Sequence, residues 1–194
     1  AVGSSKPMVA ARPQQTGPIG ANNRIRSALI GAGGRGNAVA RDWQLNPEGV
    51  FVATCDVDQT RVNNSVKALM GRQNESPVQG YEDYRRILER NDVDAVLIGT
   101  PDHWHSPMTI EAISAGKDVF CEKPVSNTVE AAVRMRDAAR KSNRIIQIGT
   151  QQRSWVHFME AARLFHEGAV GSTIRHVVMH PPGGGGGAGA PPAD

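Results

Sequence analysis

The stretch IRSALIGAGGRG, residues 25–36, decides the fold. Residues 25–30 form a short, mostly apolar run, which is typical of a strand buried in a parallel sheet. Glycines then follow with the spacing G-x-G-x-x-G, and residues 37–45 have the pattern of a helix that ends before Pro47. A strand, this glycine turn and a helix in that order predict a site for the pyrophosphate of a dinucleotide, because the helix N-terminus offers free N–H groups.

Each glycine of this turn has a separate expected task. Gly31 permits the tight turn, Gly33 lets the backbone approach the pyrophosphate, and Gly36 lets the helix pack closely on the strand. Gly34 and Arg35 complete the turn, and we include them among the expected cofactor-binding residues.

A carboxylate follows the next apolar run, residues 49–55. Asp56 stands 20 residues after Gly36, at the expected end of a second strand. A carboxylate there can accept hydrogen bonds from the ribose hydroxyls of adenosine, and it repels a 2′-phosphate. The expected cofactor is therefore NAD rather than NADP, although the nearby Arg61 keeps NADP open.

Strands and helices alternate along the rest of the first 150 residues. Further short apolar runs predict strands at 95–98, 118–121 and 145–148. The intervening segments predict helices at 59–70, 81–89, 106–115 and 127–142. Pro107 is expected in the first turn of its helix, and Asn127 with Glu130 is expected to form a capping box. This alternation predicts an α/β fold with a Rossmann-type, doubly wound parallel sheet, whose ligand lies at the carboxyl ends of the strands.

Composition divides the chain into three parts. Residues 1–23 lack periodicity and predict a disordered lead-in. Residues 24–150 are the expected nucleotide-binding domain. Residues 151–194 predict the start of an incomplete second α+β domain, with a helix over 155–167, a strand over 173–179 and a flexible Gly/Pro-rich end.

Bulk properties exclude several classes of function. The net charge is +3 and the basic residues are scattered, which does not favour nucleic-acid binding. No apolar stretch approaches the length of a membrane span. Cys55 and Cys121 lie in apolar runs and are expected to be buried, reduced thiols. His103 and His105 lack the further ligands that a metal site needs, so no metal is expected.

Two later stretches closely resemble the Gfo/Idh/MocA oxidoreductases. These are GTPDHWH, residues 99–105, and GKDVFCEKP, residues 116–124, and the resemblance extends over residues 24–179. It implies a Rossmann domain followed by a C-terminal domain that holds the substrate and often mediates oligomers. Members of this family mostly oxidise or reduce sugars and inositols with NAD or NADP, and some are NAD-dependent glycosidases.

The resemblance also assigns residues to the site. Its cofactor-side positions match Thr100, Pro101, His105, Glu122, Lys123 and Gln151. It places Lys123 beside the nicotinamide and the reacting hydroxyl, where an ammonium can hydrogen-bond the substrate oxygen and help to move its proton. Lys123 and His105 are the catalytic candidates, although His105 could instead structure its loop. Trp104 either lines the sugar site or only packs against neighbouring residues of the protein.

Three functional hypotheses follow. The first is an NAD-dependent oxidoreductase that acts on a sugar, an inositol or a related polyol and forms a homo-oligomer when full length. The second is an NAD-dependent glycoside hydrolase. The third is an NAD-binding fragment that is inactive without its C-terminal domain, because the family's D-x-x-x-H motif does not follow Lys123. The protein is expected in the cytoplasm, or in the periplasm if an upstream twin-arginine signal was removed.

Overall fold

The computed structural model describes residues 24–73, 77–169 and 171. Contacts within the chain divide it into two units between Thr150 and Gln151. The second unit contains a 3-10 helix, Gln151–Ser154, and α6, Val156–His166. The expected lead-in over 1–23, the strand over 173–179 and the Gly/Pro-rich end lie outside the described residues.

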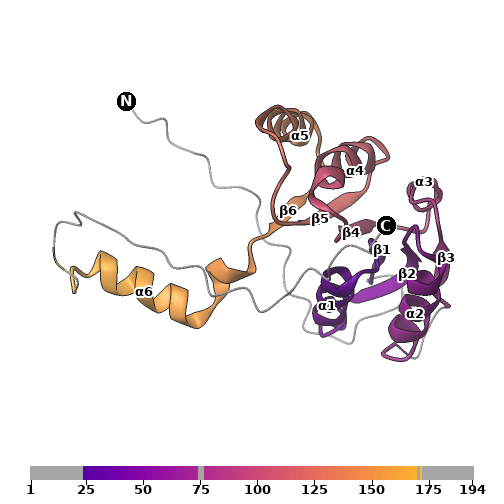
Figure 1. Cartoon of the computed structure of the whole chain (residues 1–194), viewed down its shortest axis with the longest axis horizontal. Helices are drawn as coiled ribbons and strands as arrows, with labels where there is room; N and C mark the ends of the chain where they lie inside the picture. The colour runs from indigo at the N-terminus through magenta and orange to yellow at the C-terminus, as the bar shows by residue number, and fades with distance from the viewer. Residues whose placement is uncertain (1–23, 74–76, 170, 172–194) are drawn as a thin grey trace, which may run out of the picture. The chain divides into compact units, whose positions relative to one another are not determined.

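The first unit is built on one parallel sheet in the order β3-β2-β1-β4-β5-β6 (Figure 1). The strands are β1 (Ile25–Ile30), β2 (Gly49–Cys55), β3 (Gln79–Tyr81), β4 (Ala95–Ile98), β5 (Asp118–Glu122) and β6 (Ile146–Gly149). This is the order of a Rossmann fold, so the predicted fold class is confirmed. The order reverses between β1 and β4, where such folds bind their ligands.

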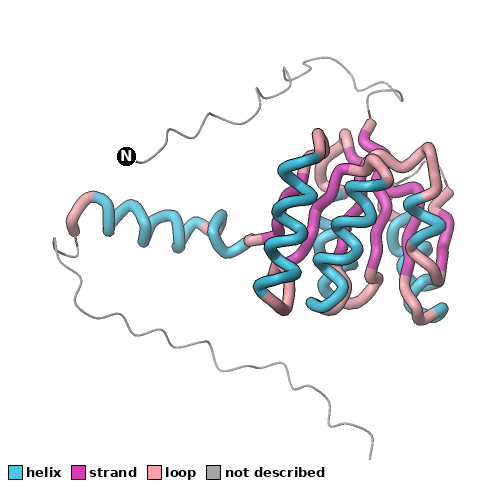
Figure 2. Tube along the Cα trace, turned by 90° about the horizontal axis from the view of Figure 1, so that it is seen from above, coloured by secondary structure: helices cyan, strands magenta, loops and turns pink. Residues whose placement is uncertain are grey.

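Helices cover both faces of the sheet (Figures 1 and 2). One face carries α1 (Gly34–Trp43) and α2 (Gln59–Met70); the other carries α3 (Arg85–Leu88), α4 (Asp102–Ser114) and α5 (Val129–Lys141). Successive strand residues point to opposite faces, so Leu29 joins the core beneath α1 while Ile30 joins the core beneath α4. Both faces of β1, β2 and β4 are largely buried, which explains their continuous apolar runs.

The expected helix over 81–89 is wrong in its first half. Gln79–Tyr81 forms the edge strand β3, and α3 covers only Arg85–Leu88. Strand β3 consists of the exposed Gln79, a glycine and the half-buried Tyr81, and therefore has no apolar alternation in its sequence. Its clearest signal is Gly80, because a Cβ at this position would lie 2.4 Å from Val62 Cγ1 of α2. This glycine lets α2 approach the edge of the sheet.

Two helices begin earlier than expected. Helix α1 begins at Gly34, because the backbone N–H of Asn37 already donates to the carbonyl of Gly33, at 3.0 Å. Helix α4 begins at Asp102, so Pro107 stands inside the helix, and its expected place in the first turn is wrong. The start of α4 directly after Pro101 brings this helix closer to the end of β4.

The predicted capping box of α5 is also wrong. The helix begins at Val129, and Thr128 is its N-cap residue. The Oγ1 atom of Thr128 accepts a hydrogen bond of 3.2 Å from the N–H of Ala131. Asn127 therefore lies outside the helix.

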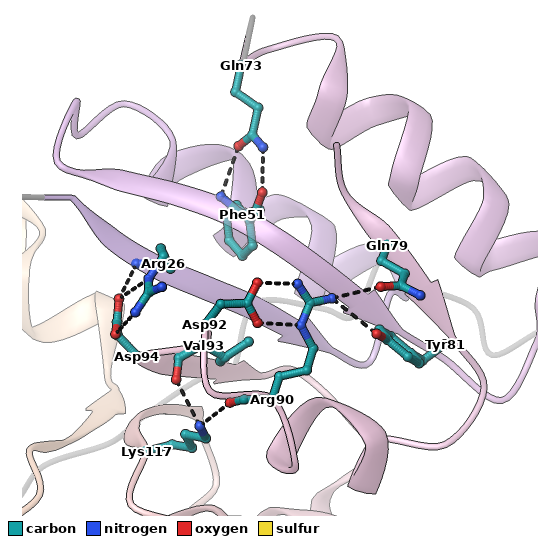
Figure 3. A network of polar contacts seen from close by, with 10 residues as sticks. All are labelled: Arg26, Phe51, Gln73, Gln79, Tyr81, Arg90, Asp92, Val93, Asp94 and Lys117. Atoms are coloured by element: carbon teal, nitrogen blue, oxygen red, sulfur yellow. Dashed lines mark hydrogen bonds and ion pairs between the residues drawn. The ribbon is translucent and has the colours of Figure 1, made fainter. Parts of the chain in front are cut away.

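Charged side chains tie together the segments that lead into the strands (Figure 3). The Arg26 guanidinium donates to both carboxylate oxygens of Asp94, at 3.1 and 2.9 Å. The buried Lys117 ammonium donates to the carbonyls of Arg90 and Val93, at 2.6 and 3.0 Å. These contacts join β1, β4 and β5 at their amino ends, opposite the glycine turn.

Candidate active site

The glycine turn brings the ends of β1 and β4 into backbone contact. Gly31 has a φ of +91°, and a Cβ on it would lie 2.7 Å from the backbone nitrogen of Thr100. A Cβ on Gly36 would lie 1.9 Å from the carbonyl oxygen of Gly31, and one on Gly99 would lie 2.7 Å from the Cα of Gly36. No side chain larger than hydrogen fits at these contacts. Helix α1 therefore lies directly against the switch point, the place between the ends of β1 and β4 where the strand order reverses.

The N-terminus of α1 is open. Its N-cap residue, Gly33, carries no side-chain cap, and the first turn contains no acidic residue. By contrast, the Asp58 side chain caps α2 by accepting from the N–H groups of Thr60 and Arg61. A Cβ on Gly34 would meet nothing within 4 Å. Free N–H groups at a positive helix end, with open space before them, fit a pyrophosphate.

Asp56 ties the second strand to the glycine turn. It is only 8% exposed, and its Oδ2 atom accepts a 2.8 Å hydrogen bond from the N–H of Ala32. Its Oδ1 atom accepts a 3.1 Å bond from the N–H of Asp58. Each carboxylate oxygen can accept another hydrogen bond. Asp56 thus lies beside the glycine turn with acceptor capacity to spare, and its bond to Ala32 was not foreseen from the sequence.

Arg61 reaches toward the same turn from α2. Its Nη1 atom lies 3.8 Å from the position that a Cβ on Gly33 would take. Its Nε atom lies 3.7 Å from Asp58 Oδ2, and this pair is half exposed. A cation therefore lies beside the turn, five residues after Asp56 in the sequence.

Glu122 and Arg35 link the end of β5 to the glycine turn. Glu122 is buried, and its Oε1 atom accepts a 2.7 Å bond from Arg35 Nη2. Its Oε2 atom accepts a 3.3 Å bond from the backbone N–H of Lys123. A Cβ on Gly149 would lie 2.7 Å from Glu122 Oε1, so β6 also closes on this carboxylate. The pairing of Arg35 with Glu122 was missed because the two residues are distant in sequence.

Lys123 follows β5 at the carboxyl edge of the sheet. Its side chain is exposed, and no hydrogen bond or ion pair of its ammonium is found within the part of the chain that the structure describes. The peptide bond between Lys123 and Pro124 is cis. An unengaged ammonium at this edge can bind a substrate oxygen.

His105 is almost completely buried, at 1% exposure. Its Nδ1 atom lies 2.6 Å from the carbonyl oxygen of Pro124, and its Nε2 atom lies 2.9 Å from that of Thr100. Both ring nitrogens thus face backbone groups of neighbouring loops. The Thr100 hydroxyl is buried and has no hydrogen-bond partner among the described residues.

Three of the remaining candidates belong to the N-terminal part of α4, and one belongs to the second unit. His103 and Trp104 form a ring contact with centroids 5.9 Å apart, and Trp104 is exposed. Pro101 is the N-cap residue of α4. Gln151 belongs to the second unit, so its relation to the turn stays a prediction.

Two buried thiols border the site carboxylates. Burial, and then the neighbouring Asp56 charge, raises the pKa of Cys55 to about 12. Burial raises the pKa of Cys121, beside Glu122, to about 11. Both cysteines are free and buried, which confirms the expectation for them. With such pKa values they stay protonated at neutral pH and are not nucleophiles.

The described residues offer neither a metal site nor a membrane-spanning helix. Within residues 24–73, 77–169 and 171, no group of three or more His, Cys, Asp or Glu side chains could hold a metal ion. No helix of these described segments is long and apolar enough to cross a membrane.

Comparison with known proteins gives a consistent result. A family model described as "Oxidoreductase family, NAD-binding Rossmann fold" matches residues 25–150. Inositol 2-dehydrogenase 4 of Saccharopolyspora erythraea is 32% identical over 82% of this chain. A glycosyl hydrolase family 109 protein of the same organism is 30% identical over 79% of the chain. The chain spans 45% and 34% of the lengths of these two relatives.

Solved structures show the same likeness. The myo-inositol 2-dehydrogenase from Lactobacillus plantarum has a TM-score of 0.70 and 27% identity, over 78% of this chain and 43% of its own. KijD10, a 3-ketoreductase from Actinomadura kijaniata solved with NADP, has a TM-score of 0.66 and 26% identity, over 77% of this chain and 46% of its own.

Proposed function

Because this chain belongs to the Gfo/Idh/MocA family of oxidoreductases and carries its NAD-binding Rossmann domain, we propose that it is the cofactor half of an NAD-dependent enzyme. The proposed substrate is a sugar, an inositol or a related polyol, oxidised or reduced at a carbinol carbon. The family resemblance predicted from the sequence is thereby confirmed.

The open N-terminus of α1 is the observation that carries this proposal. Gly33 and Gly34 leave the space before the helix free, while Gly31 and Gly36 hold the helix against the switch point. Uncapped N–H groups of the first turn bind the pyrophosphate, since the helix dipole adds to their donors.

Asp56 selects the cofactor in this proposal. Its carboxylate accepts from the ribose hydroxyls with the lone pairs that Ala32 and Asp58 leave free. A 2′-phosphate would meet this buried negative charge, which favours NAD over NADP. Arg61 offsets part of that repulsion, so NAD is expected to bind only moderately more tightly than NADP.

Lys123 acts on the substrate. A bound nicotinamide supplies the site that gives or accepts the hydride. The Lys123 ammonium donates a hydrogen bond to the reacting oxygen and gives it a proton when the carbon is reduced; in the oxidation direction the neutral amine of Lys123 takes this proton from the hydroxyl. Glu122 anchors the backbone of Lys123, and Arg35 holds Glu122 in place.

Calorimetry tests the cofactor assignment. The chain is titrated with NAD and, separately, with NADP, and we expect NAD to bind more tightly. Replacement of Asp56 by Asn removes the charge but keeps the shape, and should narrow the difference between the two cofactors. Absence of binding by both would refute the proposal.

Turnover tests the role of Lys123. The chain within its complete reading frame is mixed with NAD and a panel of inositols and sugars, and the absorbance of NADH is followed. Lys123→Met should abolish turnover while NAD binding stays within about twofold of the unsubstituted protein, because the side chain acts on the substrate. An active Lys123→Met enzyme would exclude this role.

The likeness to a glycosyl hydrolase family 109 protein supports a second candidate, an NAD-dependent glycoside hydrolase. This reaction returns the hydride to the substrate, so aglycone is released without net NADH. Chromogenic glycosides distinguish the candidates: release that is lost when NAD is stripped supports the hydrolase, and accumulation of NADH supports the dehydrogenase. A homo-oligomer is proposed for either enzyme, and light scattering tests it.

A further inference from the structure

One buried imidazole ring joins the loops that follow β4 and β5. His105 stands in the first turn of α4, with Nδ1 2.6 Å from the carbonyl oxygen of Pro124 and Nε2 2.9 Å from that of Thr100. A carbonyl oxygen only accepts hydrogen bonds and a neutral imidazole has one N–H, so both contacts are hydrogen bonds only when both ring nitrogens carry hydrogen. The ring therefore spans two neighbouring loops at the carboxyl edge of the sheet.

Each of these loops carries a group on which the proposed function depends. Thr100 directly follows Gly99, which lies against the glycine turn. Lys123 directly precedes Pro124, and its own backbone N–H makes only a long 3.3 Å contact with Glu122. The bond to the carbonyl of Pro124 is therefore the shorter restraint on the segment that carries the ammonium.

The burial of His105 separates it from the reacting atoms. Its side chain is 1% exposed, whereas the side chain of Lys123 is exposed. Both of its nitrogens already lie within hydrogen-bond distance of backbone oxygens. A ring in this setting is placed to hold backbone rather than to exchange protons with a substrate.

From this geometry we infer that His105 is a positioning residue, which holds the Thr100 loop and the Lys123 loop at a fixed separation. Its action on catalysis rests on the proposed function, because it works through the presentation of Lys123 beside the cofactor edge. A histidine that merely filled space would restrain neither loop selectively.

Two substitutions separate the two restraints. The amide nitrogen of Asn lies about where Nδ1 of His lies, and that of Gln lies about where Nε2 lies. His105→Asn therefore keeps a donor toward the carbonyl of Pro124, and His105→Gln keeps one toward that of Thr100. The two variants form a matched pair, because each is neutral and each retains one donor.

Amide hydrogen exchange of the 194-residue chain, measured without cofactor, reports on each loop. In His105→Asn, the amide of Gly99, which donates to the carbonyl of Ile30 beside the Thr100 loop, should exchange about tenfold faster, while that of Lys123 stays unchanged. In His105→Gln, the amide of Lys123, which donates to Glu122, should exchange about tenfold faster and that of Gly99 should stay unchanged. The dissociation constant of NAD should rise about tenfold only in His105→Asn, because the Thr100 loop adjoins the turn.

The test depends on the two loops responding in opposite ways to the two variants. Equal responses of both loops in both variants would overturn the inference and leave His105 as a core residue. If the unsubstituted chain fails to bind NAD, the proposed function fails, while the exchange measurements still decide the role of His105.

A measurement on the unsubstituted chain covers the case in which the variants do not fold. With ¹⁵N-labelled histidine, the ring of His105 should show N–H signals at both Nδ1 and Nε2 that are protected from exchange with water, since each nitrogen faces a carbonyl oxygen. A rapidly exchanging or absent N–H signal at either nitrogen would overturn the inference.

Discussion

A methyl group would have opposite consequences at Gly33 and Gly36, although both belong to one turn. A Cβ on Gly33 would meet nothing closer than Arg61 Nη1 at 3.8 Å, whereas one on Gly36 would lie 1.9 Å from the carbonyl oxygen of Gly31. The first glycine keeps space for a ligand, and the second keeps space for the protein's own backbone.

This contrast gives a prediction with an internal control. Gly33→Ala should change the free energy of unfolding by less than about 0.5 kcal/mol and weaken NAD binding. Gly36→Ala should lower the free energy of unfolding by about 3 kcal/mol, because helix and turn must move apart. Urea unfolding and NAD calorimetry measure both effects. Equal destabilisation by the two substitutions would contradict the separation of roles.

The pairing of Arg35 with Glu122 gives a second prediction at this scale. Arg35→Met leaves the buried Glu122 carboxylate without its cation and should lower the free energy of unfolding by about 2 kcal/mol, a value reduced by the partial exposure of Arg35. Adding Glu122→Gln should restore about 1 kcal/mol. Urea unfolding of the four proteins completes a double-mutant cycle, and a coupling energy near zero would argue against the pair.

The sequence predicts single site residues better than their partners. The turn glycines and Asp56 are recognisable because their chemistry depends on neighbours close in the chain. The contacts of Arg35 with Glu122 and of His105 with Pro124 form only when loops from different strands meet. The spacing of these residues along the sequence does not indicate such contacts, so they could be found only in the folded structure.

At the scale of elements, the interior of the fold was predictable and the boundaries were not. The apolar runs of β1, β2 and β4 identify them, since both faces of these strands are buried. The edge strand β3 has three residues, of which only Tyr81 is partly buried, and it pairs through its backbone with β2 alone, so no side-chain pattern revealed it. The residue at which a helix begins depends on which nearby side chain caps its N-terminus, as the start of α5 shows.

The cap of α5 provides the prediction at this scale. Thr128→Ala removes the acceptor of the Ala131 N–H and should lower the free energy of unfolding by about 1 kcal/mol. Thr128→Ser keeps the hydroxyl and should stay within about 0.5 kcal/mol of the parent chain. Asn127→Ala is the matched control, because Asn127 does not cap, and urea unfolding compares all three. A larger loss for Asn127→Ala than for Thr128→Ala would reverse this assignment.

For the first unit as a whole, the two ends of the strands have different tasks. At the amino ends, Arg26, Asp94 and Lys117 are engaged with neighbouring segments. At the carboxyl ends, the α1 N-terminus and the Lys123 ammonium are open. The contacts at the amino ends of the strands stabilise the sheet. The carboxyl ends keep hydrogen-bond donors free for a ligand. Burial lowers the pKa of Lys117, and the neighbouring Asp94 and Asp92 charges oppose this shift.

The response of the whole first unit to alkali depends on its two buried thiols. An unfolded cysteine loses its proton near pH 9.0, whereas folded Cys55 and Cys121 keep theirs until about pH 12 and about pH 11. Between these values the unfolded state binds fewer protons, so stability falls as the pH rises above 9. Each thiol should remove roughly 1 kcal/mol between pH 8 and pH 10.

Replacing both thiols isolates this effect. In the Cys55→Ala/Cys121→Ala chain, the fall in unfolding free energy between pH 8 and pH 10 should be smaller by roughly 2–3 kcal/mol. Tyr84, whose pKa burial and Glu111 raise to about 12, contributes equally to both chains, as does Lys117. Any constant loss of packing cancels, because only the change with pH is compared by urea unfolding. Identical falls in the two chains would show that the thiols do not control alkaline stability.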